Sequence, residues 1–135
     1  MFTAKVYKIC IASASGAMKE ERVALDVVVR WNCQHGEEKG TIYLQVPHKM
    51  TPDVYVFVID NFVDTAKIDA AIATGARVFL FFATYHDANN TMESELKAVA
   101  DFRDNVQTRC TCLHYKDGHG FELTLSEVLN QVEKN

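Results

Sequence analysis

Apolar residues recur along the chain in two alternating patterns, one typical of β-strands and one with helical spacing. Short runs rich in Val, Ile, Phe and Tyr predict strands over residues 4–13, 41–47, 53–60, 76–82 and 108–117. Apolar residues spaced three or four apart predict helices over about residues 18–31, 64–75, 92–106 and 121–135. The polar stretch 32–40, with two glycines, predicts a loop. Alternating strands and helices indicate a mostly parallel sheet with helices on both faces.

The connection between the second and third predicted strands does not fit a parallel arrangement. Only residues 48–52 join strand 41–47 to strand 53–60, whereas a parallel crossover needs about a dozen residues or more. We therefore expect strand 41–47 either to pair antiparallel with strand 53–60 or to form an antiparallel edge elsewhere. The expected fold is a single α/β domain over residues 1–135 with a five-stranded sheet, parallel except for such an edge strand.

Composition and charge narrow the classes of function. The 135 residues are 48% hydrophobic, which allows a sizeable core in one domain. A net charge of -4 offers no basic footprint for duplex nucleic acid. The chain contains no apolar run long enough to span a membrane, and residues 1–16 lack the features of a signal peptide. We expect a cytoplasmic protein with no nucleic-acid or membrane partner.

The cysteines stand at positions 10, 33, 110 and 112 and form no C-x-x-C pair. Cys110 and Cys112 alternate along a predicted strand, so both point to one face. Buried or half-buried thiols are the favoured interpretation for a cytosolic protein. A zinc site that adds His114 or His119 is the less favoured alternative, because the spacing differs from that of common zinc motifs. We therefore predict no metal site.

Two loops are the expected ligand sites, because parallel sheets bind ligands beyond the carboxyl ends of their strands. The first runs from Ser13 to Met18, and the second from Asp60 to Thr65. Ser15 and Gly16 allow close approach of a phosphate to a helix N-terminus. The alternative is a plain turn with Ser15 as the N-cap, since no glycine-rich phosphate motif is present.

Three stretches carry a resemblance to a family: YKICIASASGAMKEERVALDVVVRWN (residues 7–32), PDVYVFVIDNFVDTAKIDAAIATGARVFLFF (52–82) and the end of the chain from residue 102 to 132. They resemble short bacterial domains related to nucleoside 2-deoxyribosyltransferases and TIR domains. The resemblance implies a flavodoxin-like fold with a pocket at the strand carboxyl ends. Active members cleave N-glycosidic bonds of nucleosides or NAD with a glutamate, while other relatives bind nucleotide signals or serve in anti-phage defence.

The resemblance assigns roles to particular residues. Ser13 and Ser15 match the loop that lines the ribose or phosphate, Asp53 matches an aspartate before the third strand, and Asp60 follows that strand. The catalytic glutamate falls on Lys67. An ammonium group neither attacks nor stabilises an oxocarbenium-like centre, but it holds a phosphate well. The helix that relatives carry between the second and third strands is also missing.

We therefore predict a non-catalytic domain that binds a nucleotide or NAD-derived ligand, with no firmly required cofactor. Tyr85 and His86 follow strand 76–82 and would line the same mouth, unless they form a solvated loop. An active N-glycosidase is one alternative, with Asp60, Asp64 or Asp69 as the acid. Asp64 also has the position of an N-cap, and Asp69 that of a surface residue. A homo-oligomeric interaction module is the other alternative.

Overall fold

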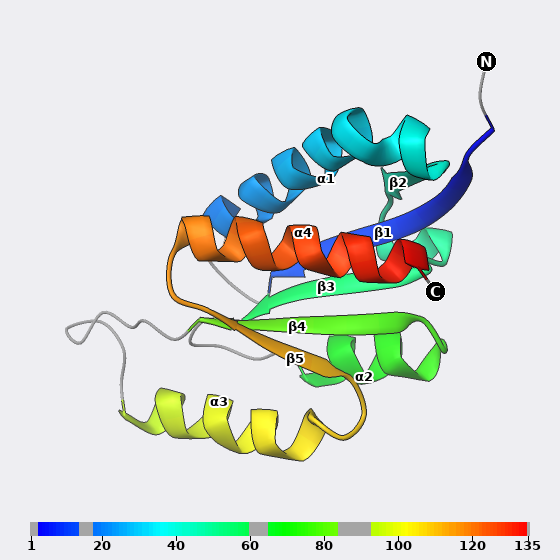
Figure 1. Cartoon of the computed structure of the whole chain (residues 1–135). Helices are drawn as coiled ribbons and strands as arrows, with labels where there is room; N and C mark the ends of the chain where they lie inside the picture. Colours follow the sequence, from blue (N-terminus) through cyan, green and yellow to red (C-terminus); the bar gives the residue numbers. More distant parts are fainter. Residues whose placement is uncertain (1–2, 14–17, 60–64, 84–92, 135) are drawn as a thin grey trace.

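The computed structural model describes residues 3–13, 18–59, 65–83 and 93–134. These residues form five strands and four helices in the predicted order, plus one short 3-10 helix (Figure 1). Their bounds are β1 Lys5–Ser13, α1 Met18–Lys39, β2 Thr41–Gln45, η1 His48–Met50, β3 Val54–Ile59, α2 Thr65–Ala73, β4 Arg77–Ala83, α3 Glu93–Val106, β5 Thr111–Tyr115 and α4 Gly118–Lys134.

The strands form one sheet in the order β2-β1-β3-β4-β5, and every neighbouring pair is parallel. This is the strand order of flavodoxin-like folds. The expected α/β fold class is therefore confirmed. Figure 1 shows α1 and α4 on one side of the sheet and α2 and α3 on the other.

The prediction of an antiparallel second strand is wrong, and the register of β1 explains why. Ile9, in the middle of β1, pairs with Gln45 on one side and with Val54 on the other. β2 thus lies beside the first half of β1, and β3 beside the second half. The connection only crosses the width of β1, about 10 Å for two strand spacings, and does not return along a whole strand. Residues 46–53, with η1, are long enough for that.

The predicted loop over residues 32–40 is also wrong, because α1 continues to Lys39. The polar side chains there favoured a loop, but Gln34, Glu37 and Glu38 are simply exposed on the helix. Gly36 faces β2, and a Cβ at this position would lie 2.7 Å from Cδ1 of Ile42. The glycine therefore permits close packing of a helix against the edge strand rather than marking a turn.

The core consists of two apolar layers, one on each face of the sheet. Alternate residues of β3 point to opposite faces, so that Val56 packs towards α1 and α4 while Phe57 packs towards α2 and α3. All six residues of β3 are buried. Each large apolar side chain buried in this way contributes about 1.5–3 kcal/mol. No helix among the described residues is long and apolar enough to cross a bilayer.

Candidate functional site

One region of the sheet lacks a covering helix. In a β-α-β crossover, a helix normally packs across the strands that it connects. Here η1 takes the place of that helix between β2 and β3. A cavity of about 260 Å³ lies on this side of the sheet, between β1, β3, α2 and η1. Its walls are formed by Cys10, Ala12, His48, Tyr55, Phe57, Lys67 and Ala70.

The floor of the cavity is aromatic. The rings of Tyr55 and Phe57 lie parallel, with an interplanar angle of 2° and centroids 5.7 Å apart. The Tyr55 hydroxyl shares a hydrogen bond with Nδ1 of His48, which fixes η1 over the strands. Burial raises the pKa of Tyr55, so its hydroxyl stays protonated at neutral pH. Both rings are buried, Tyr55 at 2% and Phe57 at 7% exposed, so they give the cavity an apolar wall.

Lys67 is the lysine that lines this cavity, and it stands on the first turn of α2. Burial raises the pKa of the Cys10 thiol in the cavity, Glu21 raises it further, and the Lys67 ammonium acts in the opposite direction. Lys67 is one of the residues that form the cavity wall. Cys10 is 8% exposed and remains a neutral thiol, so it is unsuited to act as a nucleophile.

The cavity lies on one face of β1 and β3, the two strands between which the strand order reverses. Ser13 ends β1 and pairs with Val58, so the backbone of Ser13 stands at the carboxyl edge as predicted. Residues 14–17 and 60–64 follow these two strands in the chain. The predicted site residues Ser15, Gly16, Asp60, Asp64, Tyr85 and His86 lie outside the described residues.

Among the candidate catalytic acids, Asp69 falls within the described residues, and it lies on a different face of α2 from Lys67. Positions 67 and 69 are about 200° apart around a helix, so the two side chains leave α2 on opposite faces. The carboxylate of Asp69 accepts a hydrogen bond from Arg109 at 3.2 Å. Its side chain is 55% exposed. Asp69 does not line the cavity that contains Lys67.

Asp53 has a structural role at the amino ends of the strands. Its Oδ2 accepts a hydrogen bond from the Lys8 N–H at 2.9 Å, and its own N–H donates to the Lys8 carbonyl oxygen at 2.8 Å. Its carbonyl oxygen accepts from the Arg77 N–H. Asp53 thereby fixes the start of β3 between β1 and β4.

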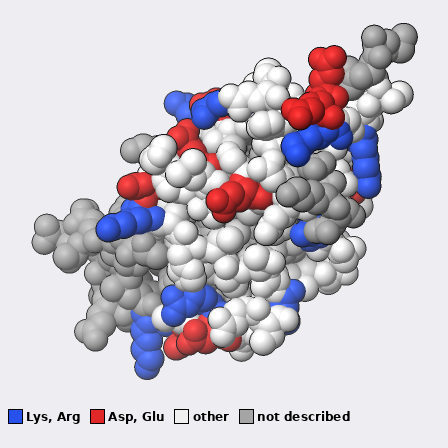
Figure 2. Space-filling view, viewed as in Figure 1, with Lys and Arg blue, Asp and Glu red and all other residues white. Residues whose placement is uncertain are grey.

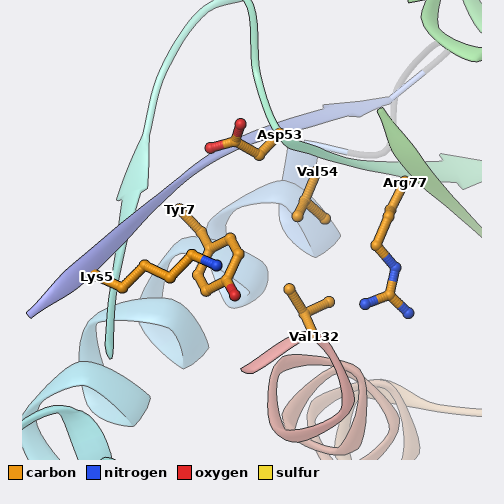
Figure 3. A pocket seen from close by; sticks show the side chains of 6 residues that line it. All are labelled: Lys5, Tyr7, Asp53, Val54, Arg77 and Val132. Atoms are coloured by element: carbon orange, nitrogen blue, oxygen red, sulfur yellow. The ribbon is translucent and has the colours of Figure 1, made fainter. Parts of the chain in front are cut away.

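A second cleft, of about 420 Å³, lies at the same amino edge (Figure 3). Lys5 and Arg77 stand on opposite sides, with Val54 and Val132 between them. The Lys5 ammonium lies 4.7 Å from the Tyr7 ring centre, so an aromatic face already stabilises this charge. Cations near Val132, in the last turns of α4, also suit the negative end of the helix dipole. These interactions account for the positions of the Lys5 and Arg77 charges, so the cleft gives no sign of a ligand site.

Neither the surface charge nor the possible metal ligands indicate a further binding site in the part of the chain that the structure describes. Figure 2 shows basic and acidic side chains interspersed on the visible face, not gathered into one basic patch. The part of the chain that the structure describes contains no group of three or more His, Cys, Asp and Glu side chains able to hold a metal ion.

Comparison with known proteins identifies the fold and no family. No family model matches the chain, and no curated protein matches it either. A de novo designed P-loop fold protein, solved by NMR in solution, is 15% identical with a TM-score of 0.53, over 99% of this chain and 96% of that chain. At this identity, the likeness shows the fold alone.

Two larger proteins match more distantly. Homoserine dehydrogenase of S. aureus is 9% identical with a TM-score of 0.48, over 82% of this chain. The flavodiiron protein from Giardia intestinalis is 12% identical with a TM-score of 0.41, over 98% of this chain. The present chain spans about a third of each of these proteins, 33% and 36%.

Proposed function

We propose that this chain binds a small nucleotide-like ligand, a nucleotide or an NAD derivative, at the carboxyl side of β1 and β3. The observation that carries the proposal is the cavity between η1, the sheet and α2, which combines an aromatic floor with the ammonium of Lys67. Ligand sites of flavodoxin-like sheets lie at this switch point.

The two parts of the cavity suit two parts of such a ligand. Tyr55 and Phe57 offer an apolar surface for a base, and Lys67 offers a point charge for a phosphate. The cavity is smaller than the roughly 300–1,000 Å³ typical of sites that enclose a whole drug-sized molecule. It therefore suits one ring of the ligand, while the remainder extends out of the cavity.

Binding without bond cleavage is the activity that these residues favour. Cleavage of an N-glycosidic bond needs a carboxylate close to the sugar carbon. The resemblance to deoxyribosyltransferases and TIR domains aligns their glutamate with Lys67, and Asp69 points away from the cavity to Arg109. The domain would then sense or sequester a ligand, and the same resemblance suggests phage-defence or counter-defence signalling as the setting.

Thermal unfolding with added ligands tests this proposal. The ligands are NAD, ADP-ribose, cyclic ADP-ribose isomers and single nucleotides, each at graded concentrations up to the millimolar range. A ligand at 100 times its Kd adds about 2.7 kcal/mol to the free energy of unfolding. For a domain of this size, that raises Tm by about 8–12 °C. If none of these compounds shifts Tm, the proposed site does not bind nucleotides.

The same samples distinguish binding from catalysis. Each ligand that shifts Tm is incubated with the protein and then separated by chromatography. We expect the ligand to be recovered intact. Release of the free base would establish an active N-glycosidase instead, and an acid from the loop 60–64 would then be the first candidate.

A further inference from the structure

Helix α1 lies on one side of the sheet (Figure 1) and carries a stripe of apolar side chains that face away from it. Leu25, Val29 and Cys33 follow one another at intervals of four residues, so they lie on one face of the helix. Leu25 and Val29 are 38% and 61% exposed, and Cys33 is exposed as well. Val29 is the most exposed large apolar residue in the part of the chain that the structure describes. The core is formed by other positions of α1, such as Val28 and Trp31, so the fold does not need this stripe.

Charged residues beside the apolar stripe alternate in sign along α1. Arg22, Asp26 and Arg30 form the neighbouring row on the helix surface, and Glu37 extends the apolar row by one more interval of four. All four are exposed. Arg30 also pairs with Glu122 of α4 at 3.4 Å. Arg22 and Glu37 form no ion pair with the residues that the structure describes, so the two ends of the stripe offer opposite charges to another chain.

We propose that α1 is the interface of a homodimer, in which it packs antiparallel against α1 of a second copy around Val29. A two-fold axis beside Val29 places this residue against its own equivalent, and it places Leu25 near Cys33 of the second copy. An interface with this symmetry uses the same surface twice, so the surface must be complementary to itself.

The positions of the charges along α1 support the antiparallel arrangement. Arg22 lies about 10.5 Å before Val29 along the helix axis, and Glu37 lies about 12 Å after it. In an antiparallel pair, Arg22 of each copy therefore faces Glu37 of the other. Asp26 and Arg30, about 4.5 Å before and about 1.5 Å after Val29, oppose one another in the same way. A parallel pair would instead place each charge against its own equivalent, which is unfavourable.

The dimer should be weak, and it should leave the proposed ligand site open. A contact between one helix of each chain buries less than the roughly 1,200 Å² that is typical of stable interfaces. Burial of Val29 supplies the attraction, while the charged pairs mainly fix the orientation. We therefore expect a Kd in the micromolar range. The cavity that contains Lys67 lies on the opposite face of the sheet, so ligand binding and dimerisation can be measured separately.

Sedimentation of the whole chain at graded concentrations across the micromolar range tests the interface. We expect the wild type to change from monomer to dimer as the concentration rises. Val29→Asp places a charge at the centre of the contact and should remain monomeric throughout, with an unchanged Tm because the side chain is exposed. Leu44→Asp, the matched control, makes a similar change at a residue of β2 that is 51% exposed, and it should dimerise like the wild type.

Charge reversal tests the antiparallel orientation. Arg22→Glu and Glu37→Arg should each raise the Kd by about tenfold, because each turns two attractive pairs of the dimer into repulsive ones. The double variant restores both pairs and should recover the Kd of the wild type. An equal mixture of the two single variants should form a heterodimer, since every pair across it is again of opposite sign. A variant that merely folds poorly would not be rescued in this way.

A wild-type protein that stays monomeric throughout the range would overturn the proposal. So would a Val29→Asp variant that dimerises like the wild type, or a folded Leu44→Asp variant that loses the dimer, because either result places the contact elsewhere. Failure of both the double variant and the mixture to recover the dimer would exclude the antiparallel arrangement.

Discussion

The side-chain amide of Asn32, on α1, binds both backbone groups of Tyr43 in the edge strand β2. Asn32 Nδ2 donates to the Tyr43 carbonyl oxygen, and the Tyr43 N–H donates to Asn32 Oδ1, each at 2.9 Å. The N–H and C=O of one strand residue point to the same side, and β1 takes the groups on the inner side. Asn32 therefore occupies the outward groups in the middle of β2, where another strand would otherwise pair.

Replacing Asn32 by alanine should destabilise the protein and expose the edge strand β2 to pairing with another chain. Leaving the two backbone groups of Tyr43 without their partner should cost about 1–3 kcal/mol in the free energy of unfolding. Urea denaturation measures this loss, and size exclusion with light scattering should show concentration-dependent association of the variant beyond that of the wild type. Gln34→Ala, at an exposed position of the same helix, should show neither effect. Equal stability of the two variants would contradict the role of Asn32.

Gly36→Ala should destabilise the protein, although alanine is the better helix former. The added Cβ would lie 2.7 Å from Ile42 Cδ1 and 3.1 Å from the Thr41 carbonyl oxygen, so the Ile42 side chain must move and the Thr41 backbone must give way slightly. Such overpacking costs about 1–3 kcal/mol, measurable by denaturant unfolding. Gly118→Ala is the control, since nothing lies within 4 Å of its new Cβ. We expect that variant to be neutral or more stable by up to about 1 kcal/mol.

Ligand binding should depend on Lys67 and on the space beside Ala70. Lys67→Gln removes the positive charge at the cavity, and a lost hydrogen bond to a charged group should weaken Kd by about 10–100-fold. Ala70→Leu fills the cavity from the exposed side of α2 and should prevent binding without loss of stability. Calorimetric titration with the ligand that most raises Tm measures both effects. Lys97→Gln makes the same charge change on α3 and should bind normally.

The ion pair between Asp69 and Arg109 should contribute little. Both side chains are about half exposed, and such surface pairs stabilise by about 0.2–1 kcal/mol. Asp69→Asn should therefore unfold within that range of the wild type, and it should bind the ligand unchanged. A large loss of ligand binding in this variant would instead place Asp69 in the binding site.

Stability should fall at alkaline pH because of Cys110. The folded state raises the pKa of this thiol from 9.0 to about 11, so it holds the proton more tightly than the unfolded chain does. The free energy of unfolding should be independent of this group below pH about 9 and should decrease between pH about 9 and about 11. Urea unfolding across this range under reducing conditions measures the slope. Cys110→Ser should reduce it, and an unchanged slope would exclude the Cys110 thiol as its source.

The candidate site was predicted only in part. Lys67 was singled out from its position in a family resemblance, and the structure places it at a cavity. The other described lining residues were missed, because Tyr55 and Phe57 belong to a continuous apolar run that also fits a fully covered strand. The short connection 48–52 could have predicted the cavity. Because it is too short to contain a full helix between β2 and β3, part of the sheet face lacks a covering helix.

By itself, the sequence determined the elements and their class. Period-two and helical patterns located every strand and helix within a few residues, except for the end of α1, because these patterns report which face each element buries. Gly75, the last residue of the predicted helix 64–75, follows α2 with φ of 83°, a conformation that favours glycine. The properties of neighbouring residues in the chain were sufficient to predict these elements and this helix end.

Only the tertiary structure decided how β2 joins the sheet and where α1 ends. The parallel direction of β2 depends on the double pairing of Ile9, and the extension of α1 depends on contacts of Asn32 and Gly36 with β2. These are contacts between residues far apart in the chain or across a tight helix–strand junction. No periodic pattern encodes them, because their free energy exists only once both partners are packed together.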